Sequence, residues 1–129
     1  MNHGRTIFLI FIHAFWLNLI WENLHSFLYF LPNGQVITEY ILLRSTFLDA
    51  LFIAFLGFIF LRSRYLQKHS WLIFVIGVVV AITVERFALA HGLWAYRDTM
   101  PVIPLVGTGL TPTIQLGLLG YLVIKRIDS

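Results

Sequence analysis

Four apolar stretches make up most of this chain of 129 residues, and each is long enough to cross a bilayer as a helix. The hydrocarbon core of a bilayer is about 30 Å thick and takes roughly 20 helical residues. Charged residues make up 12% of the chain, against about 25% in an ordinary soluble domain. The sequence therefore predicts an all-α integral membrane four-helix bundle. We expect it to form one domain over residues 1–129, with spans at about 6–30, 40–61, 71–94 and 102–125.

The basic residues indicate how such a bundle is oriented. Most Lys and Arg residues fall at span ends that share a side with the N-terminus, namely Arg5, Arg62, Arg64, Lys68, Lys125 and Arg126. The opposite side carries Glu39 and the neighbours Arg97 and Asp98. Since Lys and Arg accumulate on the cytoplasmic side, we expect both termini in the cytoplasm and the chain in a bacterial cytoplasmic (inner) membrane. Basic span ends are a result of topology, so we expect no nucleic-acid partner.

The fourth apolar stretch is interrupted near its start by Pro101, Pro104 and two glycines, which argue against a regular helix there. Thr111 is a good N-cap and Pro112 suits the first helical position. A helix over residues 112–126 would be about 22 Å long, which is too short to cross the core. We therefore expect residues 100–110 to dip into the membrane as irregular chain, covered by protein or lining a cavity.

Polar side chains gather in the half of the bundle that faces away from the cytoplasm, whereas the inner half is almost wholly apolar. The outer half holds Asn18, Glu22, Asn23, His25, Arg44, Asp49, Glu85, Arg86, His91, Thr111 and Gln115. Charges exposed to lipid are unfavourable by about 2.5–3.5 kcal/mol each on insertion scales, so we expect these groups to turn inward. They would either lock the helices through ion pairs, with Arg44 and Arg86 as the cations, or form a functional site.

In the functional interpretation, Glu85, Glu22 and Asp49 are the acid–base groups, because burial and neighbouring cations adjust how firmly a carboxyl holds its proton. The side chains expected to contact a bound molecule are Asn18, His25, Arg44, Arg86, His91, Trp94, Tyr96, Thr111 and Gln115. We expect no metal and no cofactor. Glu22 and His25 have the Glu-x-x-His spacing of di-iron bundles, but those bundles use two such pairs.

Two sets of motifs resemble known families. One set is similar to a group of small uncharacterised bacterial membrane proteins with four spans, and it consists of Trp21-Glu22, Tyr29, Asp49, Glu85, Gly92-Leu93-Trp94-Ala95-Tyr96, Met100-Pro101, Pro104, Gly107, Gly109-Leu110, Pro112 and Gln115. Glu85, Gly92-Leu93-Trp94 and residues 107–112 are also similar, more faintly, to small lycopene cyclase subunits. That resemblance implies a pocket for an isoprenoid chain, although Ile114 and Gln115 stand near where those subunits have two glutamates.

The leading hypothesis is therefore a polar pocket in the outer half that binds a lipid-like or isoprenoid molecule among membrane lipids. The alternative is a non-catalytic helper or assembly subunit of a larger membrane complex, or a homo-oligomer. A transporter or channel needs a polar route through both halves, and the apolar inner halves of the second and third stretches argue against one.

Overall fold

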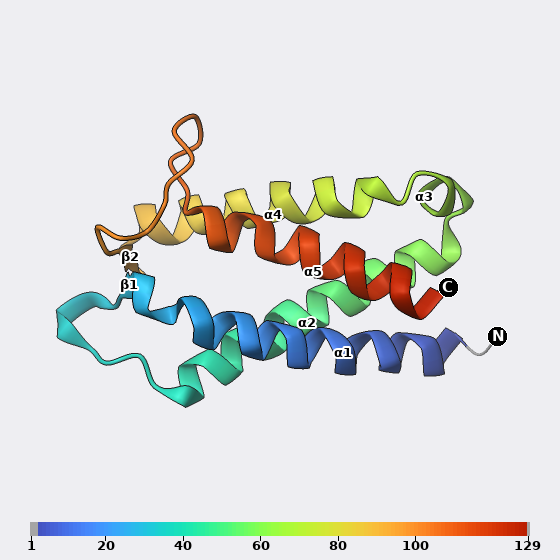
Figure 1. Ribbon diagram of the computed structural model, residues 1–129, viewed down its shortest axis with the longest axis horizontal. Coiled ribbons are helices and arrows are strands. Elements are labelled where there is room, and N and C mark those ends of the chain that lie inside the picture. The colour runs from blue at the N-terminus through green and yellow to red at the C-terminus, as the bar shows by residue number, and fades with distance from the viewer. Residues whose placement is uncertain (1–2, 129) are drawn as a thin grey trace.

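The computed structural model describes residues 3–128 and confirms an all-α fold. Four long helices lie alongside one another (Figure 1): α1 (His3–His25), α2 (Glu39–Arg62), α4 (Trp71–Ala90) and α5 (Leu110–Asp128). The shorter elements are the 3₁₀ helices η1 (Ser26–Leu28) and η2 (Pro32–Gly34), the helix α3 (Arg64–Lys68), and the strands β1 (Tyr29–Phe30) and β2 (Ala95–Tyr96). Three segments, His3–Leu28, Glu39–Arg62 and Trp71–Ala90, are long and apolar enough to cross a membrane.

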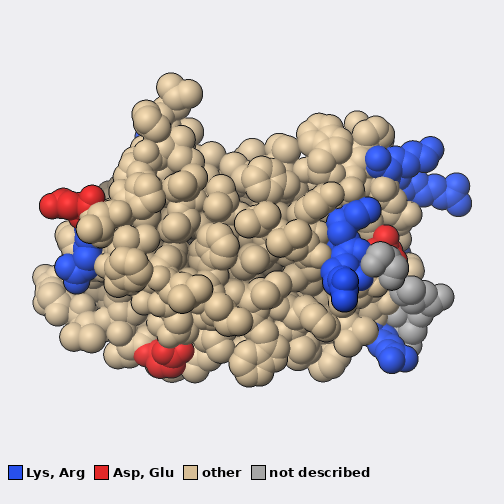
Figure 2. All heavy atoms as spheres, viewed as in Figure 1, with Lys and Arg blue, Asp and Glu red and all other residues tan. Residues whose placement is uncertain are grey.

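The two ends of the bundle differ in charge. The start of α1, the end of α5 and the helix α3 lie at one end, and β1 and β2 lie at the other, which is called the ladder end here. Basic side chains gather at the α3 end, and the side of the molecule between the two ends shows no charged residue over most of its length (Figure 2). Large apolar side chains on the long helices are exposed, among them Phe55, Phe87 and Leu122. This distribution fits a protein whose sides face lipid.

The helices pack as two pairs that α5 joins. α1 packs along α2, α4 packs along α5, and α5 also contacts α1 and α2. The α4–α5 contact is close because two glycines meet: a Cβ placed on Gly77 would lie 2.3 Å from the Cα of Gly117. Away from the ladder end the core is apolar and includes Ile53, Phe60 and Ile124. Glycines that let backbones approach are a common device of membrane helix pairs.

A two-residue β-ladder ties the outer ends of α1 and α4 together. Tyr29 pairs with Tyr96 in antiparallel register, and the Arg97 N–H donates to the Leu28 carbonyl at 2.8 Å. α4 stops at Ala90, earlier than the predicted span end near 94, because Gly92 adopts φ 66° and closes the helix. The Gly92 N–H donates to Leu89 and the next N–H to Ala88, which is the Schellman pattern.

The fourth long helix begins earlier than the sequence predicts. α5 starts at Leu110 and has 19 residues, or about 28 Å of helix. Thr111 is therefore inside the helix and is not its N-cap. Pro112 is tolerated within the first turn because the N–H groups there have no partner inside the helix. The expected length of about 22 Å was too short for this reason.

Residues 101–110 form a small hairpin that projects sideways from the bundle beside the start of α5 (Figure 1). The Ile103 N–H donates to the Thr108 carbonyl at 2.9 Å, and the Leu110 N–H to the Pro101 carbonyl at 2.7 Å. The hairpin tip is apolar, and Leu105 is 97% exposed. The prediction of non-helical chain here is confirmed up to Gly109, whereas its entry into the membrane stays a prediction.

Candidate functional site

One buried amide, that of Gln115 on α5, joins three helices. Its Nε2 lies 2.8 Å from Asn18 Oδ1 and 3.1 Å from Glu22 Oε1, both on α1, and 3.1 Å from Asp49 Oδ2 on α2. Asn18 is fully buried and donates its own Nδ2 to the Ala14 carbonyl, which turns its Oδ1 toward Gln115. The amide of Gln115 therefore sits among three oxygen acceptors, of which two belong to carboxyl groups.

His25 extends this group toward the ladder end. Its Nε2 lies 3.3 Å from Glu22 Oε2, and its Nδ1 lies 2.9 Å from the hydroxyl of Thr111 on α5. The Thr111 hydroxyl in turn donates to the sulfur of Met100 at 3.6 Å. Glu22 and His25 are three residues apart on one helix face, so the carboxyl and the imidazole meet without any help from another helix.

Glu85 on α4 is held by two tyrosines from the β-ladder. The hydroxyls of Tyr29 and Tyr96 both donate to Glu85 Oε1, at 3.0 and 2.6 Å. The Gly109 N–H donates to the Tyr96 oxygen at 2.9 Å, so the Tyr96 hydrogen is left for Glu85. Two donors on a single carboxyl oxygen are the arrangement expected for an ionised carboxylate.

The two groups are in contact through aromatic rings. The centre of the Tyr29 ring lies 5.5 Å from the centre of the His25 ring and 5.4 Å from that of the Tyr96 ring, and both pairs are packed edge to face. We call the whole set the polar network; it consists of Asn18, Glu22, His25, Tyr29, Asp49, Glu85, Tyr96, Thr111 and Gln115. Trp94 lies beside it, and its buried indole N–H faces Glu85 without reaching hydrogen-bond geometry.

Burial raises the pKa of both ladder tyrosines above the ordinary tyrosine value. At Tyr29 the negative charge of Glu85 adds to the effect, and at Tyr96 the hydrogen bond to Glu85 does so. Both phenols therefore keep their hydrogens at neutral and mildly alkaline pH. They remain donors to Glu85 under all ordinary conditions.

Besides Trp94, three predicted site residues lie outside the polar network. Arg44 is exposed, and His91 is exposed and bonds to the carbonyl of Phe87 on its own helix. Arg86 donates to the Val106 carbonyl and so holds the hairpin. Within residues 3–128, no Lys or Arg forms an ion pair with Glu22, Asp49 or Glu85. The expected pairs of Arg44 and Arg86 with these acids are therefore not formed.

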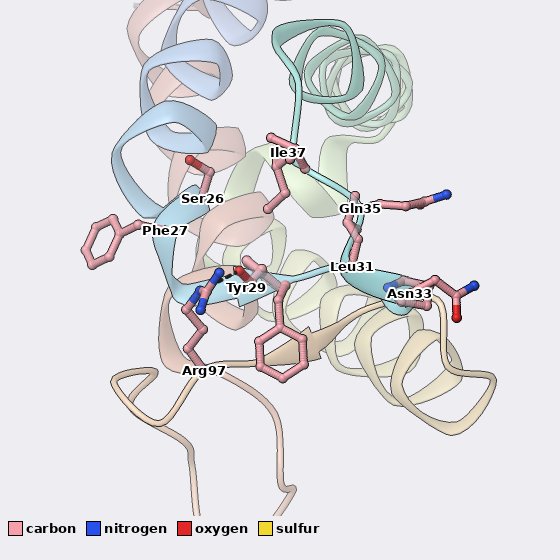
Figure 3. A pocket seen from close by; sticks show the side chains of 12 residues that line it. Ser26, Phe27, Tyr29, Leu31, Asn33, Gln35, Ile37 and Arg97 are labelled. Carbon is pink, nitrogen blue, oxygen red and sulfur yellow. Dashed lines mark hydrogen bonds between the residues drawn. The ribbon is translucent and has the colours of Figure 1, made fainter.

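A cavity of about 790 Å³ opens at the ladder end, next to the polar network. Its wall is mostly apolar, and Leu31 and Ile37 face the space whereas Asn33 and Gln35 point away from it (Figure 3). Arg97 lies at its edge, where its Nε donates to the Tyr29 carbonyl at 3.1 Å and its guanidinium lies 5.4 Å from the Phe30 ring centre. The lining residues are Ser26, Phe27, Tyr29, Phe30, Leu31, Pro32, Asn33, Gly34, Gln35, Val36, Ile37 and Arg97.

None of the cavity-lining residues is in the predicted site set, and the most important of them are Tyr29 and Arg97. Tyr29 does continue the stripe of Asn18, Glu22 and His25 at helical spacing, which is a signal that could have placed it. Arg97 gives no such signal, because its position depends on the pairing of β1 with β2. Tyr29 matters most, since its hydroxyl binds Glu85 and its ring and carbonyl line the cavity.

Comparison of the chain with models of protein families, with curated proteins and with solved structures found no match. Among residues 3–128, no group of three or more His, Cys, Asp or Glu is placed to hold a metal ion. Function therefore has to be inferred from the polar network and the cavity beside it.

Proposed function

We propose that this protein is a four-span integral membrane protein whose outer half binds a lipid-like or isoprenoid molecule and offers it acid–base groups. In this proposal α5 is the fourth span, both termini are cytoplasmic, and the ladder end faces away from the cytoplasm of a bacterial cell. The six basic residues at the α3 end support this orientation.

The observation that carries the proposal is that Glu22, Asp49 and Glu85 come together from three helices without a Lys or Arg counter-ion among the described residues. Side chains that only lock membrane helices contribute about 0.6 kcal/mol per contact on average. Placing an ionisable group in the membrane is unfavourable by about 2.5–3.5 kcal/mol on insertion scales. A purely structural role would be better served by pairing these acids with Arg44 and Arg86, and neither arginine does so. Uncompensated intramembrane carboxyls are functional candidates by default.

The cavity suits an amphipathic ligand. Its apolar wall around Leu31 and Ile37 would receive a hydrocarbon chain, and Arg97 would hold a polar or anionic head group through the guanidinium donors that Tyr29 does not use. Tyr29 connects the two regions, because it lines the cavity and donates to Glu85. A ligand that displaces the Tyr29 hydroxyl would gain direct access to the Glu85 carboxylate, which would act as the base.

The test is mass spectrometry of small molecules that remain bound after gentle detergent purification. We expect the wild-type protein to retain a lipid-like molecule, the Glu85→Gln variant to lose it, and both to elute as the same folded species. His91→Gln is the matched control, because His91 directly follows the same helix, is exposed and lies outside the polar network. An empty wild-type protein, or equal retention by Glu85→Gln, would show that the proposal is wrong.

A second candidate is a helper subunit of a larger membrane complex, and the apolar hairpin favours it. Leu105 projects from the side of the bundle almost fully exposed, where a partner helix could cover it. This function predicts stable copurification with another protein, which Leu105→Ser abolishes, and no bound small molecule. The two proposals are distinguished by what copurifies with the protein: a small molecule in the first and another protein in the second. The polar network has no part in the helper function.

A further inference from the structure

We propose that Glu22 and Asp49 share one proton, so that the polar network stores an acid inside the bundle. The inference starts from a count of hydrogens. The Gln115 amide nitrogen carries two hydrogens, but three acceptors lie within 3.1 Å of it, on Asn18, Glu22 and Asp49. Asn18 takes one hydrogen at the shortest distance, 2.8 Å, because its own amide group is fixed on the Ala14 carbonyl. One hydrogen is then left for two carboxyl groups.

Two ionised carboxylates cannot stably share that hydrogen. Both carboxyl oxygens lie 3.1 Å from the same nitrogen, and no Lys or Arg between residues 3 and 128 pairs with either acid. Like charges so close in a low-dielectric interior repel strongly, and the usual outcome is that one carboxyl of such a pair keeps its proton. A proton on Glu22 or Asp49 removes the repulsion between the two carboxylates. The same proton also supplies the hydrogen that the Gln115 amide lacks for its third acceptor.

His25 connects this shared proton to a second one. With the Thr111 hydroxyl donating to the Met100 sulfur, its oxygen is left to accept from His25, and this assigns a hydrogen to His25 Nδ1. The other ring nitrogen faces Glu22 Oε2 at 3.3 Å. A proton between these two atoms leaves either imidazolium with carboxylate or imidazole with carboxylic acid, and both are neutral as a pair. Asp49, Glu22 and His25 therefore form one series of titratable groups, in which Gln115 Nε2 lies between the two carboxyls.

The charges around Asp49, Glu22 and His25 are consistent with these two protons. From α4, Glu85 is the next negative group and lies within electrostatic reach of Asp49 and His25, and from β1 the Tyr29 phenol faces Glu22. α5 contributes Gln115 and Thr111, which do not titrate. With one proton on the carboxyl pair and one at His25, the chain Asp49–Glu22–His25 is electrically neutral. Neutrality through protons explains why these acids need no arginine partner.

The inference deepens the proposed function. Only the role of the shared proton in acid–base chemistry rests on that function, whereas the presence of the proton does not. Glu85, with two hydrogen-bond donors, is the base of the network, and the carboxyl pair is its acid. Separate environments that keep one carboxyl ionised and another protonated are how membrane and soluble sites divide acid and base roles. The shared proton itself is present before any ligand binds, so it can be measured on the ligand-free protein.

The test is infrared spectroscopy of the ligand-free protein in lipid nanodiscs at pH 7, observing the C=O stretch of protonated carboxyl groups. We expect the wild-type protein to show this band, Asp49→Asn and Glu22→Gln each to lose it, and Glu85→Gln to keep it. Asp98→Asn is the matched control for Asp49→Asn and should leave the band unchanged, since Asp98 is exposed outside the network.

Absence of the band from the wild-type protein would overturn the inference, and so would its survival in Asp49→Asn. If Asp49→Asn or Glu22→Gln does not fold, the test uses folded Glu85→Gln protein whose aspartate and glutamate carboxyls carry ¹³C. A shift of the infrared band on labelling is then the supporting result. A band that does not shift on labelling would contradict the inference. Failure of the proposed function would appear elsewhere, as an empty wild-type protein in mass spectrometry with the infrared band intact.

Discussion

Replacing Gln115 with Leu should destabilise the bundle, because it removes an amide that joins α5 to both α1 and α2. Gln115 is 4% exposed and its two hydrogens serve acceptors on Asn18, Glu22 and Asp49. Hydrogen bonds between membrane helices contribute about 0.6 kcal/mol on average and about 1.7 kcal/mol at most. Two such bonds predict a loss of roughly 1–3.5 kcal/mol in the free energy of unfolding.

The assay is reversible unfolding by a denaturing detergent, followed by tryptophan fluorescence. Gln115→Glu should lose more than Gln115→Leu, because it places a further carboxyl among three acceptors and supplies no hydrogen. Leu122→Ala is the control on the same helix, since Leu122 is 49% exposed toward the lipid side. If all three variants unfold within about 0.5 kcal/mol of one another, the contacts around Gln115 are not made and the reasoning is refuted.

Three further predictions follow from particular contacts. Gly117→Ala should destabilise by about 3 kcal/mol, because the new Cβ would lie 2.4 Å from the Phe74 carbonyl, whereas Gly120→Ala, with 3.6 Å to its nearest atom, should unfold like the wild type. Tyr29→Cys with Tyr96→Cys should form a disulfide on oxidation, since these residues face each other in the ladder; failure of the thiols to pair would contradict the register. Folding raises the pKa of both phenols, so their stabilisation is complete below the ordinary tyrosine pKa of about 10 and is lost as pH rises beyond it. In the Tyr29→Phe, Tyr96→Phe double variant, the part of the tyrosine absorbance change that occurs at the highest pH should therefore be missing. The free energy of unfolding should also decrease less at alkaline pH than in the wild type. An absorbance titration identical to that of the wild type would contradict this prediction.

The helices and the one-sided distribution of polar residues could be predicted from local sequence. Apolar length set the long helices, and the steps of four and three from Asn18 to Glu22 to His25 placed those side chains on one face. Gln115 was predicted as part of the site because it is one of the polar residues in the half of the apolar stretches that faces away from the basic ends. These features depend only on residues close together in the chain.

The partners of the charged residues could not be predicted in this way. Whether Arg86 reaches an acid or a carbonyl depends on how α4 is rotated against its neighbours and on where the hairpin lies, and neither is encoded in local spacing. The clustering of Tyr29 and Tyr96 on Glu85 likewise requires the ladder, which pairs segments that are far apart in sequence. The end of α4 at Ala90 was missed, since the predicted span ran to about 94, although Gly92 is a typical helix-closing residue.

The central claim is that the polar network lies within a bilayer, near the face opposite the basic end. The most direct measurement is labelling of single cysteines with a membrane-impermeant thiol reagent in intact cells, which is clean because the chain has no Cys of its own. Gln35→Cys lies at the edge of the cavity and Lys68→Cys lies at the α3 end, and both positions are exposed. We predict that Gln35→Cys is labelled from outside and that Lys68→Cys is labelled only after the membrane is permeabilised. Labelling of both positions from outside, or of Lys68→Cys alone, would contradict the account.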